Sequence, residues 1–253
     1  MRPFRDHVLT LGETRVLVRA LIWHDPQVPG SRYETHVTVR CDGAAESGRL
    51  SRWAAAAGLK LTHIVLARGR MPSQPMLTLT GSPSYADESA RADEVTARLR
   101  ADGFEPVRVK IESTPWAPEV PREPCGGERY FEHHVKLLLA AGSDLGALAA
   151  RVVPHGAHLS WNARRAHGGG WHERFVTQRC RGVDAEGAGR ALERLLRELD
   201  GLEVVDVERE FVLFDSDVSV DDGWIEEVGG RWTAAAAAAA TGAATAVPQE
   251  VRG

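Results

Sequence analysis

The clearest pattern in the chain is the alternation of apolar and polar residues within short segments. In "ETHVTVR", residues 34–40, the two valines fall on one face of an extended strand, while His36 and Thr38 fall on the other. A similar segment, "EHHVKLL", occupies residues 132–138. Such alternation is typical of a strand that packs one face on a core and leaves the other face polar.

The two segments belong to a longer repeated pattern. The offset between them is 132 − 34 = 98 residues, and it also brings "GLKLT" onto "GAHLS" and "GFEPVRVKIE" onto "GLEVVDVERE". Three separate matches in one register predict an internal duplication. The pattern within each copy predicts a strand, a helix, two strands, a helix and a strand, and Gly58 and Gly103 mark the helix ends in the first copy.

We therefore predict an α+β protein, built as a tandem duplication of a ferredoxin-like βαββαβ unit, with antiparallel sheets that carry helices on one face. Because the helices cover the apolar face, the opposite face of each sheet is polar and carries one histidine segment. The two polar faces have three alternatives: each faces water, the sheets join edge to edge, or the faces meet across a cleft. We favour the first, since one side of an antiparallel sheet is commonly solvated.

Composition shifts predict the domain boundaries. Proline and glycine in "STPWAPEVPREPCGG" interrupt both helix and sheet and indicate a linker between the lobes. The acidic segment "FDSDVSVDDGW" indicates a capping or docking segment, and the alanine-rich end has little to bury and indicates disorder. The predicted parts are an N-terminal extension, a first lobe, a linker, a second lobe, a C-terminal extension and a disordered tail, at residues 1–30, 31–115, 116–128, 129–215, 216–232 and 233–253.

The overall composition narrows the class of function. The 253 residues carry a formal net charge of −4, and without a basic excess we expect no nucleic-acid partner. The three cysteines have no metal-ligand spacing, so we expect reduced thiols, a cytoplasmic protein, and neither a metal nor another cofactor. No apolar run approaches the roughly 20 residues of a membrane helix, so no membrane partner is expected. The sequence leaves the oligomeric state open.

The polar faces carry groups suited to acid–base chemistry and to anion binding. Imidazole titrates near neutral pH, so His36 and His134 are the candidate catalytic residues. Hydroxyl and cationic side chains on the same faces and turns form the candidate ligand-binding set: Thr38, Lys136, Arg68, Arg108, Lys110 and Arg164. This set of cations predicts that the protein binds a small anionic ligand, such as a phosphorylated molecule.

The two histidine segments resemble the motifs of the two-histidine (2H) phosphoesterases, in which each lobe contributes a His and a Thr or Ser to a shared cleft. The resemblance implies that one imidazole acts as general base and the other as general acid on a cyclic nucleotide or RNA end. The matching residues are His36 with Thr38, and His134 with Lys136 where the second hydroxyl belongs. "HVK" departs from the HxT pattern, because a lysine binds phosphate as a point charge. Anion binding without catalysis and a protein–protein interaction module remain alternative hypotheses.

Overall fold

The structure is a computed structural model that describes residues 7–11, 14–18, 33–124, 128–164 and 170–224. Most of the predicted N-terminal extension and the whole predicted disordered tail lie outside these residues. The first half contains β3 (Tyr33–Arg40), α1 (Ala44–Ala56), β4 (Lys60–Leu66), β5 (Ser73–Thr80), α2 (Tyr85–Ala101) and β6 (Glu105–Ser113). The second half contains β7 (Tyr130–Ala140), α3 (Leu145–Val152), η1 (Val153–His155), β8 (Ala157–Asn162), β9 (Trp171–Cys180), α4 (Ala185–Glu198), β10 (Glu203–Asp215) and η2 (Val218–Asp221). A separate hairpin consists of β1 (His7–Leu11) and β2 (Thr14–Val18).

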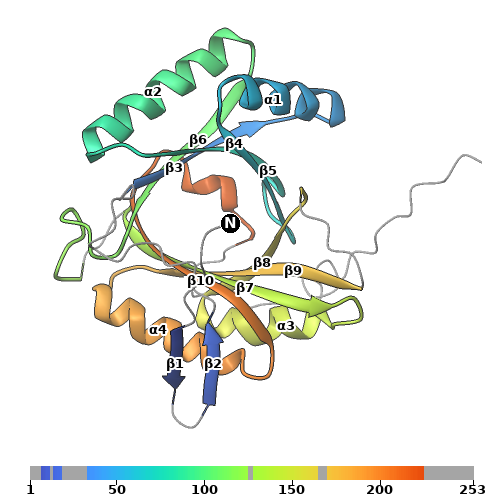
Figure 1. The fold of residues 1–253 in the computed structure, drawn as a ribbon, viewed down its shortest axis with the longest axis vertical. Coiled ribbons are helices and arrows are strands. Elements are labelled where there is room, and N and C mark those ends of the chain that lie inside the picture. Colours follow the sequence, from blue (N-terminus) through green and yellow to red (C-terminus); the bar gives the residue numbers. More distant parts are fainter. Residues whose placement is uncertain (1–6, 12–13, 19–32, 125–127, 165–169, 225–253) are drawn as a thin grey trace, which may run out of the picture.

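Eight strands form one closed antiparallel barrel in the order β10-β6-β3-β5-β4-β8-β9-β7 (Figure 1). The prediction of two ferredoxin-like units with separate sheets is therefore wrong. Helices and strands follow one another along residues 33–215 in the order that the pattern indicates, but the pattern carries no information on which sheet edges pair. Closure pairs backbone groups that open edges would leave unpaired, and this is the physical reason for a single barrel.

Two seams join the halves. At one seam β4 pairs with β8, with Ile64 opposite Asn162, and at the other β6 pairs with β10, with Ser113 opposite Phe211. A register shift between Val212 and Phe214 bends β10 at the second seam. With both edges joined, the polar faces of the two sheets turn inward and meet inside the barrel. The expectation that each polar face is solvated is therefore wrong.

The helices cover the outside of the barrel, with α1 and α2 over one side and α3 and α4 over the other (Figure 1). Each helix pair encloses an apolar core against the outer face of the strands. The buried core residues include Val37, Val39, Leu50, Leu77 and Leu99 in the first half and Val135, Leu137, Leu148, Val176 and Leu195 in the second. Each fully buried aliphatic side chain contributes about 1.5–3 kcal/mol, so these layers hold the helices in place.

Local sequence determines where the helices begin. The side chains of Ser84, Asp144 and Asp184 accept hydrogen bonds from backbone N–H groups in the first turns of α2, α3 and α4.

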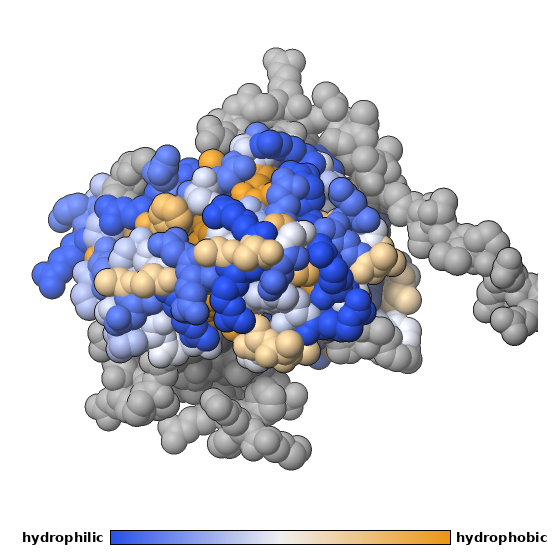
Figure 2. Space-filling view, turned by 90° about the horizontal axis from the view of Figure 1, so that it is seen from above, coloured by the Kyte–Doolittle hydropathy of each residue, from blue (hydrophilic) through white to orange (hydrophobic). Residues whose placement is uncertain are grey.

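The outer surface over α1 and α2 is mostly hydrophilic, with small separate apolar areas (Figure 2). None of the helices in the described ranges combines the length and the apolar composition that crossing a membrane requires.

The segment after β10 enters the barrel and closes one end of it. Asp221, at the end of η2, contacts the guanidinium groups of Arg108 at 2.8 Å and Arg179 at 2.6 Å, and accepts a hydrogen bond from the Gln74 amide at 2.8 Å. The indole of Trp224 donates to the carbonyl of Leu159 at 2.9 Å. We call residues 218–224 the plug.

The β4–β5 turn holds the plug from the side. The backbone N–H of Arg70 donates to the carbonyl of Asp222 at 2.7 Å. Gly69 has a φ of +117°, and a Cβ atom there would lie 3.0 Å from the same carbonyl oxygen, so the turn requires glycine on both counts. The segment "RGRMPSQP" contains Arg68, a predicted ligand-binding residue, and its backbone contacts hold the plug.

Candidate functional site: a chamber inside the barrel

The inward faces of the strands enclose a chamber of about 370 Å³. This volume is in the range of small-molecule binding sites. The charged lining residues are Glu34, Lys60, Arg108, Lys110, Glu132, Lys136, Arg179, Asp206, Glu208, Glu210 and Asp221, with His36 and His134. The polar uncharged residues are Thr38, Thr62, Gln74, Ser160, Asn162 and Thr177, and the apolar ones are Ile64, Leu66, Met76, Phe175 and Trp224. The chamber is therefore strongly polar, with an apolar wall.

His36 lies between two carboxylates. Its Nε2 atom lies 3.5 Å from Glu34 Oε1 and 3.2 Å from Glu112 Oε2. Its Nδ1 atom lies 3.2 Å from the hydroxyl of Thr78 on the neighbouring strand. Both ring nitrogens of His36 are therefore in contact with protein groups.

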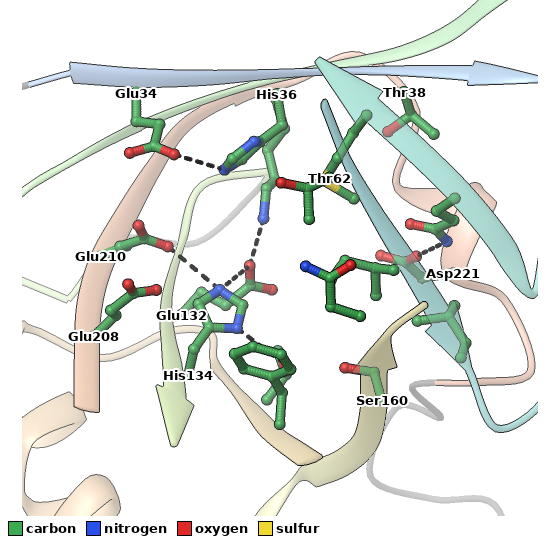
Figure 3. Close-up of a pocket in the computed structure, with 18 of the residues that line it drawn as sticks. Glu34, His36, Thr38, Thr62, Glu132, His134, Ser160, Glu208, Glu210 and Asp221 are labelled. Atoms are coloured by element: carbon green, nitrogen blue, oxygen red, sulfur yellow. Dashed lines mark hydrogen bonds and ion pairs between the residues drawn. The ribbon is translucent and has the colours of Figure 1, made fainter. Parts of the chain in front are cut away.

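His134 has the same surroundings in the second half. Its Nε2 atom lies 3.3 Å from Glu132 Oε2 and 3.3 Å from Glu210 Oε2, and its Nδ1 atom lies 2.9 Å from the Thr177 hydroxyl. Glu132 and Glu210 stand 98 positions after the two carboxylates that contact His36 (34 + 98 = 132; 112 + 98 = 210). Figure 3 shows both imidazoles directed into the chamber from opposite walls.

Lys110 connects the two histidine sites. Its Nζ atom lies 2.6 Å from Glu112 Oε1 and 2.5 Å from Glu132 Oε2. Because Glu112 also contacts His36 and Glu132 also contacts His134, the five side chains form a continuous chain of ion pairs across the barrel. The two halves thus share one charge network.

Burial and opposite charges compete in setting the pKa values of the histidines. Burial alone would lower the pKa of His36, but contact with Glu112 and the charge of Glu34 outweigh it and raise the pKa. His134 follows the same rule: burial opposes, and Glu132 and Glu210 raise its pKa well above the ordinary value. The surrounding carboxylates thus favour the cationic form of both imidazoles.

The carboxylates respond in different directions. Burial would raise the pKa of Glu112, but Lys110 and His36 lower it to about 2, and the pKa of Glu132 is lowered in the same way by Lys110 and Arg179. The pKa of Glu210 is raised to about 8, first by burial and then by the negative charge of Glu112. Burial and a neighbouring negative charge thus both favour the neutral form of Glu210.

Most of the chamber's cations are already paired. Near the plug, Arg108 donates to both oxygens of Asp215, at 2.8 and 2.5 Å, in addition to its contact with Asp221. Arg179 contacts Glu132 at 2.6 Å, and Lys136 contacts Glu173 at 3.0 Å. Little uncompensated positive charge is left for an anionic ligand.

The structure brings together six of the predicted site residues: His36, His134, Thr38, Lys136, Arg108 and Lys110 all line the chamber. Two others lie elsewhere. Arg68 borders a smaller pocket of about 50 Å³ next to His158 and Trp224. Arg164 is exposed, and its guanidinium lies 3.4 Å from the Ser51 hydroxyl.

Sequence reasoning missed the acidic half of the site. Glu34, Glu112, Glu132 and Glu210 contact the histidines, and Asp221 anchors the plug. A signal was present, because Glu-x-His occurs at residues 34–36 and again at residues 132–134. The contact of Asp221 had no such signal, since it depends on the path of the chain after β10.

One group of these side chains has the arrangement of a cation site. Glu112, Glu132, His134 and Glu210 each offer one ligand atom, and these atoms lie within 4.8 Å of one another. The ammonium group of Lys110 contacts two of the four residues. A cationic side chain of the protein thus already occupies part of this arrangement.

Comparisons with known proteins give no family. No protein-family model matches the chain, and no curated protein matches it. A solved structure described as a glycine cleavage system transcriptional repressor is similar over 73% of this chain and 98% of its own, with 12% sequence identity and a TM-score of 0.25. A likeness at that TM-score carries no argument about function.

Proposed function

We propose that this protein binds a small organic molecule inside its barrel. The observation that carries the proposal is the chamber itself, a space of about 370 Å³ that the plug closes at one end and that polar side chains surround. A barrel interior without a binding role is usually filled by side chains. Here it combines fixed charges with an apolar wall, which is the usual composition of a ligand site.

We also propose that the protein is cytoplasmic, in keeping with the free thiols of Cys41 and Cys180.

The experiment is a thermal-shift screen of the purified chain against a library of small polar metabolites. Thr62 lines the chamber, so Thr62→Trp should fill the space that a ligand needs. Thr80→Trp is the matched control, because Thr80 is exposed and lies outside the chamber lining. The expected result is a rise in melting temperature with the wild type and the control but not with Thr62→Trp. Equal responses in all three proteins would place any binding elsewhere.

Binding of an anionic or phosphorylated ligand stays a prediction from the sequence. Three of the five cations that carry the prediction line the chamber, namely Arg108, Lys110 and Lys136, and each lies within 3.0 Å of a carboxylate. An anion would have to displace these carboxylates and leave buried negative charges without partners, which is costly. The charge distribution therefore favours other ligand classes.

The 2H phosphoesterase reaction is a second candidate, favoured by one observation: His36 and His134 line the same chamber. The carboxylates around both Nε2 atoms oppose it, because a general base needs a free nitrogen and a phosphate would approach four glutamates. Hydrolysis of 2′,3′-cyclic nucleotides is the test. Turnover that both His36→Ala and His134→Ala abolish would establish this reaction in place of simple binding.

A further inference from the structure

We propose that the ligand is a small organic cation, an amine or guanidinium compound with a hydrocarbon body. Its charged group would lie against Glu34, Glu208 and Glu210. This inference rests on the proposed binding function and specifies the chemistry of the ligand. It follows from a recess in the chamber wall, from the balance of charge around that recess, and from the apolar surface opposite.

The recess is a hollow of about 20 Å³ next to the chamber. The recess and the chamber share three lining residues, Glu34, Glu208 and Glu210, so the recess lies in the wall of the chamber. Glu112 borders the recess but not the chamber. A volume of about 10–15 Å³ holds one water molecule, so the recess has the size of a single ammonium group. Its remaining borders are Tyr33, Ser113, Thr114 and the exposed residue Arg209.

Four carboxyl groups border the recess, those of Glu34, Glu112, Glu208 and Glu210. Glu112 and Glu132 have Lys110 as a shared partner, and the other cations in this part of the chamber are the two histidines, Lys60 near Glu34, and Arg209. Within the described residues, no hydrogen bond or ion pair is found for the side chain of Glu208, although it lines the chamber. Figure 3 shows Glu34, Glu208 and Glu210 gathered at the same end of the chamber. A cation placed among them would reduce the repulsion between Glu34 and Glu208 and would favour the ionised form of Glu210.

An independent observation concerns Glu112. This residue is only 1% exposed, and within the described part of the chain neither of its carboxylate oxygens accepts a hydrogen bond. Lys110 Nζ lies 2.6 Å from one of these oxygens and His36 Nε2 lies 3.2 Å from the other, so the two cations balance its charge. Glu112 borders the recess, so N–H donors that enter it would add hydrogen bonds to these two ion pairs.

The geometry favours an organic cation over a bare metal ion. A metal held by Glu112, Glu132, His134 and Glu210 would have to share its ligands with the Lys110 ammonium, at the cost of repulsion between the two cations. The chamber is also far larger than an ion requires. Its apolar wall, formed by Ile64, Met76 and Phe175 among others, would contact the hydrocarbon part of an amine.

The test is isothermal titration of the full chain with 1,4-diaminobutane and agmatine as organic cations. Butane-1,4-diol, inorganic phosphate and Mn²⁺ are the neutral, anionic and metal comparisons. Glu208→Gln should weaken binding of both amines about tenfold or more, because a charge-assisted hydrogen bond contributes about 1.5–3 kcal/mol. Glu203→Gln is the matched control, since Glu203 begins the same strand, is exposed, and lies outside the lining.

The outcomes separate the two proposals. If Thr62→Trp and Glu208→Gln weaken amine binding and Glu203→Gln leaves it unchanged, the result supports both the binding function and the organic cation as ligand. A second outcome is that the diol or phosphate binds, the amines do not, and Thr62→Trp removes the binding. This outcome overturns the proposal of an organic cation but keeps the chamber as the ligand site. Tight binding of Mn²⁺ alone, lost in Glu112→Gln, also overturns it. A wild type that binds none of the probes, and no molecule of the metabolite library, contradicts the proposed function itself.

Discussion

Lys110 Nζ lies 2.5 Å from Glu132 Oε2, and this ion pair joins a strand of the first half to a strand of the second. Both side chains are largely buried, with exposed fractions of 11% and 1%. Removing one member of such a pair leaves the other charge buried without a partner, which costs about 3–5 kcal/mol. The network around Lys110 is therefore both the chemical centre of the chamber and a connection between the two halves of the barrel.

The first prediction follows for Lys110→Met. Glu112 and Glu132 lose the cation that they share, so we expect a loss of about 3–5 kcal/mol in the free energy of unfolding, measured by urea titration. Lys136→Met is the control, because within the described residues Lys136 pairs with one carboxylate, Glu173, at 3.0 Å, whereas Lys110 pairs with two. A Lys110→Met protein as stable as Lys136→Met would show that the network does not hold the halves together.

A second prediction concerns pH. The pKa of Glu210 is raised to about 8, first by burial and then by Glu112, whereas an unperturbed glutamate titrates near 4.5. Between these two values the unfolded chain has released this proton and the folded chain keeps it, so the stability contribution of Glu210 falls as pH rises from about 4.5 to about 8. Glu210→Gln stays neutral and should flatten this part of the profile.

Urea titrations at several pH values between 5 and 8.5, roughly the window set by these pKa values, measure the slope. Glu203→Gln removes an exposed carboxylate from the same strand and should keep the wild-type slope. Other charged groups act on Glu210, namely His134, Glu112 and Glu208. An unchanged slope in Glu210→Gln would assign the pH dependence to those groups.

A third prediction concerns the plug. Asp221→Asn removes the negative charge that Arg108 and Arg179 share, so we expect the free energy of unfolding to fall by about 3 kcal/mol. Asp222→Asn is the matched control, because Asp222 is the exposed neighbour. If the two variants unfold at the same urea concentration, the contacts of Asp221 do not anchor the plug.

A fourth prediction separates backbone strain from contact at Gly69. Gly43 and Gly69 both have positive φ values, +99° and +117°, but a Cβ atom at Gly43 would meet nothing within 4 Å. Gly69→Ala should therefore cost about 1 kcal/mol or more beyond Gly43→Ala, because its methyl group meets the Asp222 carbonyl. Thermal or urea unfolding of the two variants gives this difference, and equal losses would mean that the plug moves aside.

The sequence predicts local structure far better than closure. The alternation around His36 and His134 places both side chains on the polar face, and both line the chamber. The pairing of β4 with β8 is held by three residue pairs, which include Val65 with Trp161, and nothing in the alternation of either strand distinguishes an edge that pairs from one that stays open. The class of ligand was predicted from cations alone. Their partners come from other strands, and only the closed barrel brings them together.

The short β4–β8 seam also bears on how the chain reaches its final form. Ile64 and Asn162 are 162 − 64 = 98 positions apart, whereas the β4–β5 and β8–β9 pairings join neighbouring strands. Contacts so distant in sequence form slowly, because a long loop must close before they are made. The β4–β8 pairing, which closes the barrel, should therefore form late in folding. The backbone amides of the β4–β8 pairing should also exchange with solvent before those of the other strand pairs. Local opening at this seam would let a small molecule enter the chamber while the rest of the barrel stays folded.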